Sequence, residues 1–352
     1  MRPEKSFKIP EEITSVADGA FEGCCFRSIT LHDNIERIGR QAFGGCSELS
    51  SMKIPPKIRE LETGVFDGCS SLTSVILPKC LRHIRRRAFR NCSLLESITI
   101  PEGVEVIEDE TFLGCVSLKT VSIPESVTKI GRCAFESCTG LESLIIPSGT
   151  VQMLDSAFRG CCSLHRIDIP EGITAIEDCM FSDCKSLRTI VLPDEIRIIG
   201  KGAFRGCISL EHIRIPEGTE TVGDSAFDGC RSITSLSFPD SLVHLGGGAL
   251  VNCSSLAVVV LPESLKRIEG GTFSRCSSLS RIDIPQGLES IGKGAFAGCT
   301  SLKEMMLPPS VKEIGDEAFR GCRSLEPSVP DTVTKKGRDL FRENRSIGQI
   351  IR

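Results

Sequence analysis

The chain of 352 residues contains no tryptophan and no tyrosine, so all of its Trp, Tyr and Phe rings are its 17 phenylalanines. Trp and Tyr are the aromatic anchors of many tight protein interfaces, and exposed rings are the platforms on which single-stranded nucleic acids stack. Each of the 17 phenylalanines maps to a position that we expect to face inward, including Phe7, Phe26 and Phe238. The composition therefore argues against a surface site built on aromatic side chains.

An excess of charge of one sign is also lacking. The chain has 42 Lys and Arg and 46 Asp and Glu, which gives a net charge of −4 with both signs interspersed. No bulk field therefore favours nucleic acid or an anionic membrane. No apolar run is long enough to span a bilayer. We expect neither a nucleic-acid partner nor insertion into a membrane.

The N-terminal residues 1–8 lack the apolar segment of a secretory signal. As written, the sequence predicts a cytoplasmic protein, and its many thiols agree with a reducing compartment. If the N-terminus is truncated, a cell-surface or secreted location is predicted instead.

Groups that could carry catalysis are scattered along the chain. The five histidines lie far apart, and none completes a nucleophile–base pair: His32, His83, His165, His212 and His244. There is no glycine-rich phosphate loop, and no CxxC or Cys/His cluster of the kind that binds metal. We therefore predict a non-enzymatic protein without catalytic residues, cofactor or metal site.

Phenylalanine recurs at a fixed interval of 23 residues. Leu250 takes one place in the series, and the first and last intervals are shorter by one. The series consists of Phe21, Phe43, Phe66, Phe89, Phe112, Phe135, Phe158, Phe181, Phe204, Phe227, Leu250, Phe273, Phe296, Phe319 and Phe341. A period of this size indicates a solenoid, in which each unit buries its apolar side against its neighbours.

One unit, residues 118–140, represents the repeat, which has the general form LxxIxIPxxVxxIGxxAFxxCxx. The alternation in LxxIxIP predicts a short strand, which ends at the proline because proline has no N–H to donate. VxxIG predicts a second extended segment, closed by a glycine that turns with positive φ. The spacing in GxxAFxxC is typical of a short helical turn with Ala, Phe and Cys on its inner side.

The Pro, Gly, Ala-Phe and Cys positions of this repeat match those of BspA-like leucine-rich repeats, also called the Treponema pallidum type. The chain resembles this family from about Phe7 to Asn344. The resemblance implies a β-rich leucine-rich-repeat solenoid, similar to an α/β horseshoe, and the phenylalanine series predicts about 15 coils of 23 residues. It also implies an association with protein binding and adhesion.

Both ends of the array depart from the repeat. His32 stands where a proline is expected, and the last unit has Pro327 in its strand, Lys336 in place of Ile and Asn344 in place of Cys. Polar residues at these positions indicate a terminal capping unit. We therefore predict a monomer with a single array over 1–352, divided into an irregular N-terminal unit 1–32, regular repeats 33–322, and a degenerate C-terminal capping unit with its tail, 323–352.

Fourteen of the 19 cysteines occupy one repeat position, three places after the phenylalanine. The simplest interpretation is a ladder of small buried thiols that act as hydrophobic residues. Disulfides between neighbouring coils are an alternative on separation alone. In-register side chains point the same way, however, which disfavours disulfide geometry.

The run Arg85–Arg87 could form an anion site. Glu108–Glu110 is acidic throughout and stands one period later, and Glu62 stands at the Arg85 position one coil earlier. Equivalent positions on adjacent coils are neighbours in a solenoid. We therefore predict that an ion-pair network largely neutralises the arginines, and an anion site is the alternative.

The residues two and four places before each proline are expected to point outward from the strand. In the first half of the chain they are mostly Ser and Thr, and in the second half they are charged and apolar. Either exposed positions have drifted, or the second half has a specified binding face. The candidate partner-binding residues are Arg166, Asp168, Val191, His212, Arg214, Val258, Val260, Arg281, Asp283, Glu304 and Met306.

The sequence thus favours a non-enzymatic scaffold that binds another protein on the exposed face of its repeat strands. A structural or adhesive spacer, as one segment of a cell-surface protein, is the alternative function.

Overall fold

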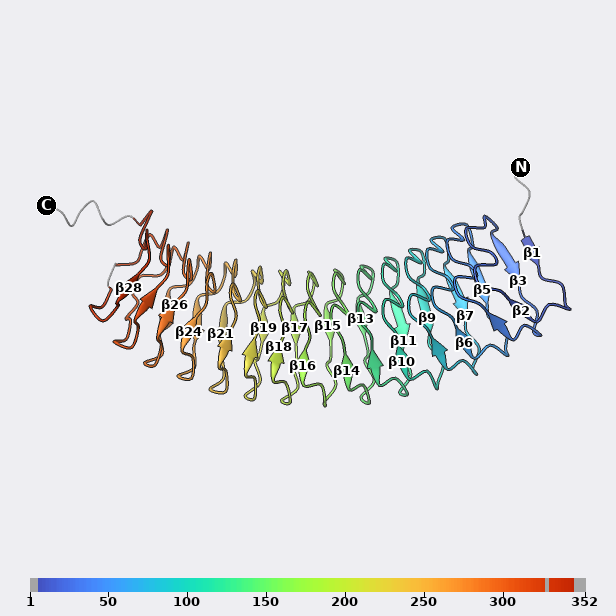
Figure 1. The fold of residues 1–352 in the computed structure, drawn as a ribbon, viewed down its shortest axis with the longest axis horizontal. Helices are drawn as coiled ribbons and strands as arrows, with labels where there is room; N and C mark the ends of the chain where they lie inside the picture. Colours follow the sequence, from blue (N-terminus) through green and yellow to red (C-terminus); the bar gives the residue numbers. More distant parts are fainter. Residues whose placement is uncertain (1–5, 327–328, 345–352) are drawn as a thin grey trace. The chain divides into compact units, whose positions relative to one another are not determined.

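The computed structural model describes residues 6–326 and 329–344, and it confirms a parallel β-solenoid of about 14 turns of about 23 residues (Figure 1). The sequence count of about 15 coils exceeds this number because the members of the phenylalanine series enclose one interval fewer than their own number. The chain falls into two compact units, Met1–Ile173 (unit 1) and Thr174–Arg352 (unit 2). The single array over the whole chain stays a prediction.

Two kinds of strand follow each other in the regular coils, except that the segment with Glu304 and Met306 forms no strand. We call those of the LxxIxIP segment face strands. In unit 1 they are β1 (Ser6–Lys8), β3 (Ser28–Thr30), β5 (Ser51–Lys53), β7 (Ser74–Ile76), β9 (Ser97–Thr99), β11 (Thr120–Ser122), β13 (Ser143–Leu144) and β15 (Arg166–Ile167). In unit 2 they are β17 (Thr189–Ile190), β19 (His212–Ile213), β21 (Ser235–Ser237), β23 (Val258–Val260) and β25 (Arg281–Asp283).

We call the strands of the VxxIG segment second strands. In unit 1 they are β2 (Ser15–Val16), β4 (Arg37–Ile38), β6 (Glu60–Leu61), β8 (His83–Ile84), β10 (Val106–Ile107), β12 (Lys129–Ile130) and β14 (Gln152–Met153). In unit 2 they are β16 (Ala175–Ile176), β18 (Ile198–Ile199), β20 (Thr221–Val222), β22 (His244–Leu245), β24 (Arg267–Ile268), β26 (Ser290–Ile291), β27 (Glu313–Ile314) and β28 (Lys335–Lys336).

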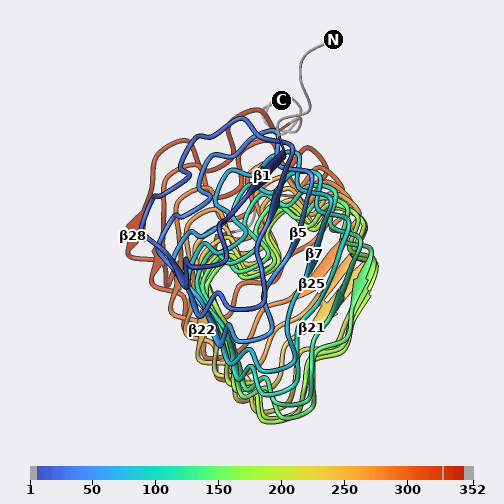
Figure 2. The same ribbon diagram turned by 90° about the vertical axis from the view of Figure 1, so that its right-hand side faces the viewer.

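The two strand types form separate sheets on opposite sides of the coil, as β21 and β22 of unit 2 show in Figure 2. The second strands build the longer ladders, one of five strands from β6 to β14 and two of four strands in unit 2. The face strands pair only in twos, except for the three-stranded sheet β21-β23-β25. All of these pairs are parallel, with equivalent repeat positions side by side.

The third segment of the coil is a series of turns, and the predicted helical turn is not confirmed. The N–H groups of Gln41 and Phe43 donate to carbonyls of the next coil, at 3.0 Å each, while the Cys46 N–H donates to Phe43 O within the coil at 3.1 Å. In an α-helix over this segment the Phe43 N–H would bond to the carbonyl four residues earlier in its own coil, not to the next coil. Because alternate N–H groups bond to the neighbouring coil, no helix forms anywhere in residues 6–326 and 329–344.

The glycine of VxxIG has another role than the predicted turn with positive φ. Residues in the left-handed region stand two before and two after the phenylalanine, as Gln41 (φ 50°) and Gly45 (φ 69°) do around Phe43. Gly131 has no such φ, but a Cβ added there would lie 2.6 Å from the backbone nitrogen of Asp109. The glycine is therefore required where it occurs because the preceding coil approaches too closely for a side chain.

The phenylalanine series forms the interior. From Phe21 to Phe158 in unit 1, successive rings stack with centroids 5.3–5.6 Å apart and planes within 14° of parallel. This spacing is in the range of offset-stacked rings. Phe26 and Phe238, outside the series, are buried as predicted. Phe7 is not: it meets Phe21 edge-on but is 45% exposed, because no coil within the described residues covers its other side.

The cysteine ladder is buried, except for Cys24 in the first coil, which is half-buried. All 19 cysteines are free thiols, so the disulfide alternative is not realised. The Cys69 Sγ–H donates to the carbonyl oxygen of Phe43 in the preceding coil at 3.0 Å, and Cys253 makes the equivalent bond to Phe227 in unit 2 at 3.2 Å. A thiol at this position therefore fills a small apolar space and also satisfies a buried carbonyl.

The predicted capping unit lies partly outside the described residues, which exclude Pro327 and the tail 345–352. Lys336 pairs in register with Ile314, and its side chain is exposed rather than buried. Buried amide atoms of Asn344 have no hydrogen-bond partner within the part of the chain that is described. The role of this unit as a cap stays a prediction. No helix in the described ranges is long and apolar enough to cross a membrane.

Candidate protein-binding face

The face strands alternate in burial, with the central residue inward and its two neighbours outward. All eleven candidate partner-binding residues are accordingly exposed. Arg166 and Asp168 belong to unit 1, and the other nine belong to unit 2. Met306 is the most prominent, with 90% exposure, although Glu304 and Met306 lie in a segment that forms no strand.

Two columns of side chains cross the three-stranded sheet of unit 2. The register places Ser235, Val258 and Arg281 in one column and Ser237, Val260 and Asp283 in the other. The middle strand β23 therefore presents two exposed valines between a strand with two serines and a strand with two charges. Side-chain volume is smallest along β21.

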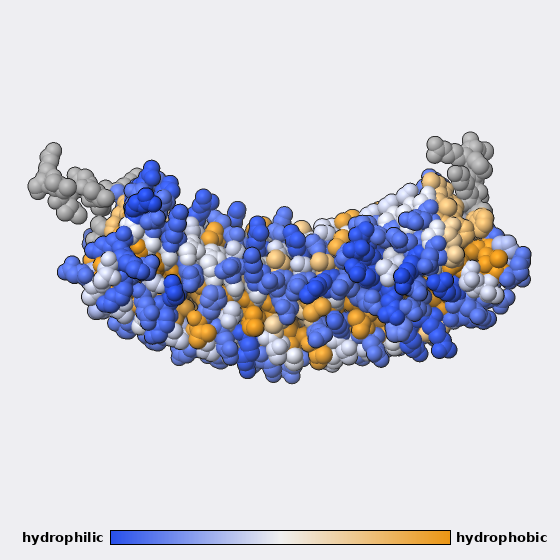
Figure 3. Space-filling model, viewed as in Figure 1, coloured by the Kyte–Doolittle hydropathy of each residue, from blue (hydrophilic) through white to orange (hydrophobic). Residues whose placement is uncertain are grey.

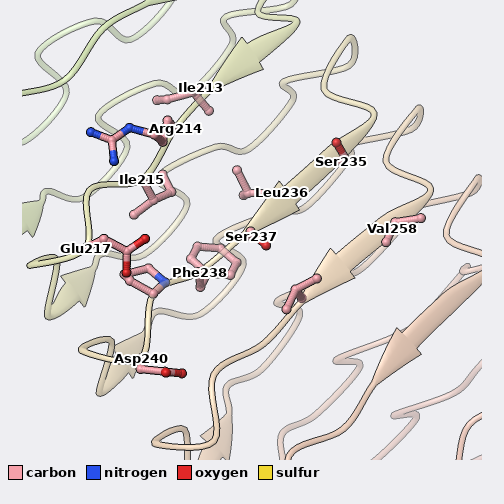
Figure 4. Close-up of a pocket in the computed structure, with 12 residues that line it drawn as sticks. Ile213, Arg214, Ile215, Glu217, Ser235, Leu236, Ser237, Phe238, Asp240 and Val258 are labelled. Atoms are coloured by element: carbon pink, nitrogen blue, oxygen red, sulfur yellow. The ribbon is translucent and has the colours of Figure 1, made fainter.

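A groove of about 460 Å³ follows from this difference in volume (Figure 4). Its floor lies along β21, where Ser235 and Ser237 are short. Val258 and Val260 line it from the coil of β23, and Arg214 lines it from the coil of β19. β19 and β21 are not hydrogen-bonded neighbours, and Ile213, an inward residue of β19, is only half-buried beside the groove. The same kind of gap separates the other pairs of face strands, so the short serines of β21 beside the valines of β23 are what distinguish this place.

Two carboxylates lie at the end of the groove where the strands finish. Glu217 and Asp240 each follow a proline and are exposed. Within the described residues neither makes an ion pair. Arg214, in contrast, is paired with Asp194 of the preceding coil. The rim of the groove therefore has an excess of negative charge.

Two further pairs of opposite charges on the predicted face neutralise each other. Arg166 and Asp168 pair along one strand of unit 1 at 3.1 Å, and Arg281 and Asp283 do the same in unit 2 at 3.2 Å. Exposed pairs of this kind stabilise a fold very little. Their guanidinium and carboxylate groups are exposed, so a partner protein that covers the face strands can contact them.

The arginine run of unit 1 is neutralised by ion pairs, as predicted. Arg85 pairs with Glu60 and, at 3.0 Å, with Glu108, while Arg87 pairs with Glu110 at 2.8 Å. The hydrogen bonds from Arg87 lower the pKa of the Glu110 carboxyl. The expected acceptor Glu62 contacts Arg40 instead, at 3.8 Å. Glu60 lies in the second strand β6, and its carboxylate, rather than that of Glu62, pairs with the guanidinium of Arg85.

Figure 3 shows one side of the molecule, on which hydrophilic residues predominate and apolar residues are interspersed among them. Within residues 6–326 and 329–344, no group of three or more His, Cys, Asp and Glu side chains is placed to hold a metal ion.

The groove was not predicted from the sequence. Ser235, Ser237, Glu217 and Asp240 are absent from the candidate residues, which were selected as charged or apolar positions of the strand. The signal was present, because the repeat aligns the two serines with valines of the next coil, and places acids directly after successive prolines. A depression becomes visible only when small side chains are compared with their neighbours on adjacent coils.

Comparison with known proteins agrees with the geometry. The family model of the BspA type leucine-rich repeat region matches residues 3–119, 105–234 and 220–348. A comparison with curated proteins gave no match.

Several solved structures are similar. A leucine-rich repeat protein from Bacteroides ovatus is 31% identical, with 85% of each chain covered and a TM-score of 0.73. A leucine rich cell surface protein from Faecalibacterium prausnitzii is 27% identical over 79% of this chain and 86% of that chain, with a TM-score of 0.58. The chain therefore belongs to the BspA-type leucine-rich-repeat family, whose repeats generally serve protein interaction and adhesion.

Proposed function

We propose that this protein is a non-enzymatic scaffold that binds a partner protein on the face strands of unit 2. The observation that carries the proposal is the exposed surface of β21, β23 and β25, where apolar side chains lie beside charged ones around a groove. The fold does not require apolar side chains at Val258 and Val260, because both are exposed and the inward residue Val259 makes the core contact. Exposed apolar residues rimmed by polar ones are typical of interaction sites.

Other parts of the proposed face extend this surface. Val191 is 73% exposed on the coil of β17, and His212 stands in register with Thr189 of that coil. Arg281 and Asp283 offer a paired guanidinium and carboxylate at the other side of the valines. A partner that covers this sheet would bury the valines and could exchange ion pairs with the rim, which supplies affinity and orientation respectively.

The alternative is a spacer that holds other segments apart and has no partner of its own. The varied outward residues would then be neutral, and the capture of a partner would not depend on them.

The test is affinity capture from extracts of the native cell with a variant in which Arg214, Val258, Val260 and Arg281 are all replaced by Ala (the face variant). A matched control replaces two apolar residues and two arginines elsewhere in unit 2: Ile198, Val243, Arg231 and Arg267, all to Ala. Both variants should keep the circular-dichroism spectrum and melting temperature of the natural chain, because all eight side chains are exposed.

We expect proteins captured by the natural chain and by the control to be lost from the face variant. Equal capture by the face variant and the natural chain would refute the assignment of the site. Absence of any specific capture by the natural chain would favour the spacer.

A further inference from the structure

The groove along β21 has a distinct chemistry on each side. Its floor carries the hydroxyl groups of Ser235 and Ser237, and the valines of β23 form an apolar wall. Figure 4 shows Ser235 and Ser237 on β21 beside Val258, with Glu217 and Asp240 near the end of the strand. The site thus combines apolar contact along the strand with negative charge at one end.

The form of the groove fits an extended chain. Its volume of about 460 Å³ is in the range of sites that bind small ligands or a few side chains. The floor runs in the direction of a β-strand, and alternate residues of an extended peptide project to the same side at intervals of about 7 Å. Serine hydroxyls both donate and accept hydrogen bonds, so they suit the alternating N–H and C=O groups of a peptide backbone.

The negative charge at the rim of the groove determines which kind of side chain can bind at this end. Glu217 and Asp240 make no ion pair within the described residues, whereas the nearby Arg214 is paired with Asp194. A basic side chain is therefore the complementary group at this end of the groove, and an acidic one would meet like charge.

We propose that this groove binds an extended peptide segment of the partner, with an aliphatic side chain against Val258 and Val260 and a lysine or arginine two or four places away, between Glu217 and Asp240. The proposal rests on the proposed function of the unit 2 face strands and adds the chemistry of the segment that they recognise.

The test begins with a library of displayed random peptides of about ten residues, selected on the immobilised full chain. Peptides that emerge are synthesised, labelled and titrated against four proteins: the natural chain, the face variant, Glu217→Lys with Asp240→Lys, and a control with Glu220→Lys and Glu289→Lys. The last two variants have the same change in net charge, and Glu220 and Glu289 are exposed in unit 2 but do not line the groove.

We expect enrichment of an aliphatic residue with Lys or Arg two or four positions away. Binding should fall by about tenfold or more with Glu217→Lys and Asp240→Lys, and little with the control, because only the former places positive charge beside the basic residue. Replacement of the peptide lysine by glutamate should restore binding to the Glu217→Lys, Asp240→Lys variant.

Three results would overturn the inference. The first is selection of peptides without a basic residue. The second is binding that the face variant loses but the Glu217→Lys, Asp240→Lys variant retains, which would refute the groove chemistry and leave the proposed face intact. The third is binding that none of the variants reduces, which would refute both.

Discussion

The interior and the face strands of the same coils differ in how far their residue types vary from one coil to the next. In the interior the same residue types recur from coil to coil: each ring stacks on its equivalent in the next coil, and the thiols and backbones form hydrogen bonds to adjacent coils. On the face strands the outward residues vary, from the serines of β21 to the valines of β23 and then to Arg281 and Asp283. A solenoid can change its surface one coil at a time because the stacking of coils does not involve that surface. Stability and recognition are therefore carried by separate sets of residues.

The strongest test of this separation is a truncation within the ring stack. Phe204 is fully buried, and its ring lies 5.6 Å from that of Phe181 and 5.4 Å from that of Phe227. Replacement by Ala should lower the free energy of unfolding by about 3–5 kcal/mol, since it removes apolar contact and leaves a cavity. Chemical denaturation measures the loss.

Leucine is the matched control at this position, because Leu250 occupies the equivalent place in unit 2. Phe204→Leu should therefore cost clearly less than Phe204→Ala. Equal effects of the two substitutions would show that the ring stack does not carry the stability assigned to it.

A smaller loss of folding stability is expected where an added side chain would push two coils apart. A Cβ at position 131 would lie 2.6 Å from the Asp109 nitrogen, so Gly131→Ala should cost about 1–3 kcal/mol through overpacking against backbone. Gly149→Ala is the control, since the nearest atom to its Cβ would be 3.7 Å away. Denaturation midpoints that move equally for both variants would contradict the close approach of coils.

The cysteine ladder predicts a loss of stability in alkaline solution. Burial raises the pKa of the Cys115 and Cys276 thiols to about 12, whereas a thiol in an unfolded chain has a pKa of about 8.5. Between these two pH values the unfolded chain releases protons that the folded chain retains, so the free energy of unfolding falls as pH rises.

Each such thiol contributes up to about 1.4 kcal/mol per pH unit to this slope. The double variant Cys115→Ala, Cys276→Ala should therefore lose less stability between about pH 8.5 and pH 10 than the natural chain. No tyrosine titrates in this range to obscure the comparison. Identical slopes for the two proteins would mean that these thiols ionise as readily in the folded chain as in the unfolded one.

The smallest effect on stability is expected on the face. Val258→Ser with Val260→Ser should change the free energy of unfolding by no more than about 0.5 kcal/mol, because both side chains point to solvent. The same variant should lose the captured partner. A large loss of stability here would break the distinction between interior and face.

The repeat made most of the architecture predictable. A constant period, an alternating segment before each proline and a cysteine three places after each phenylalanine were sufficient to predict stacked coils, outward residues on the face strands and the ladder of buried thiols. The helical turn could not be predicted correctly in the same way. The spacing of Ala, Phe and Cys is compatible with a helix, but the N–H groups of Gln41 and Phe43 bond to the next coil.

The repeat pattern also did not predict all contacts of individual side chains. The ion pairs of Arg85 and Arg87 with the acids of the next coil were predicted from equivalent positions, but the preference of Arg85 for Glu60 over Glu62 depends on side-chain direction. The exposure of Phe7 depends on which coil lies beside it, and its place in the repeat pattern is inward.

The sequence by itself determined the family, the period, the composition of the interior and the list of positions free to vary. Only the tertiary structure decided that a groove lies along β21, where two serines lie beside two valines and near two acids that make no ion pair within the described region. The reason is physical: a repeat specifies what each position packs against on average, whereas a groove arises from differences in side-chain volume and charge between neighbouring coils.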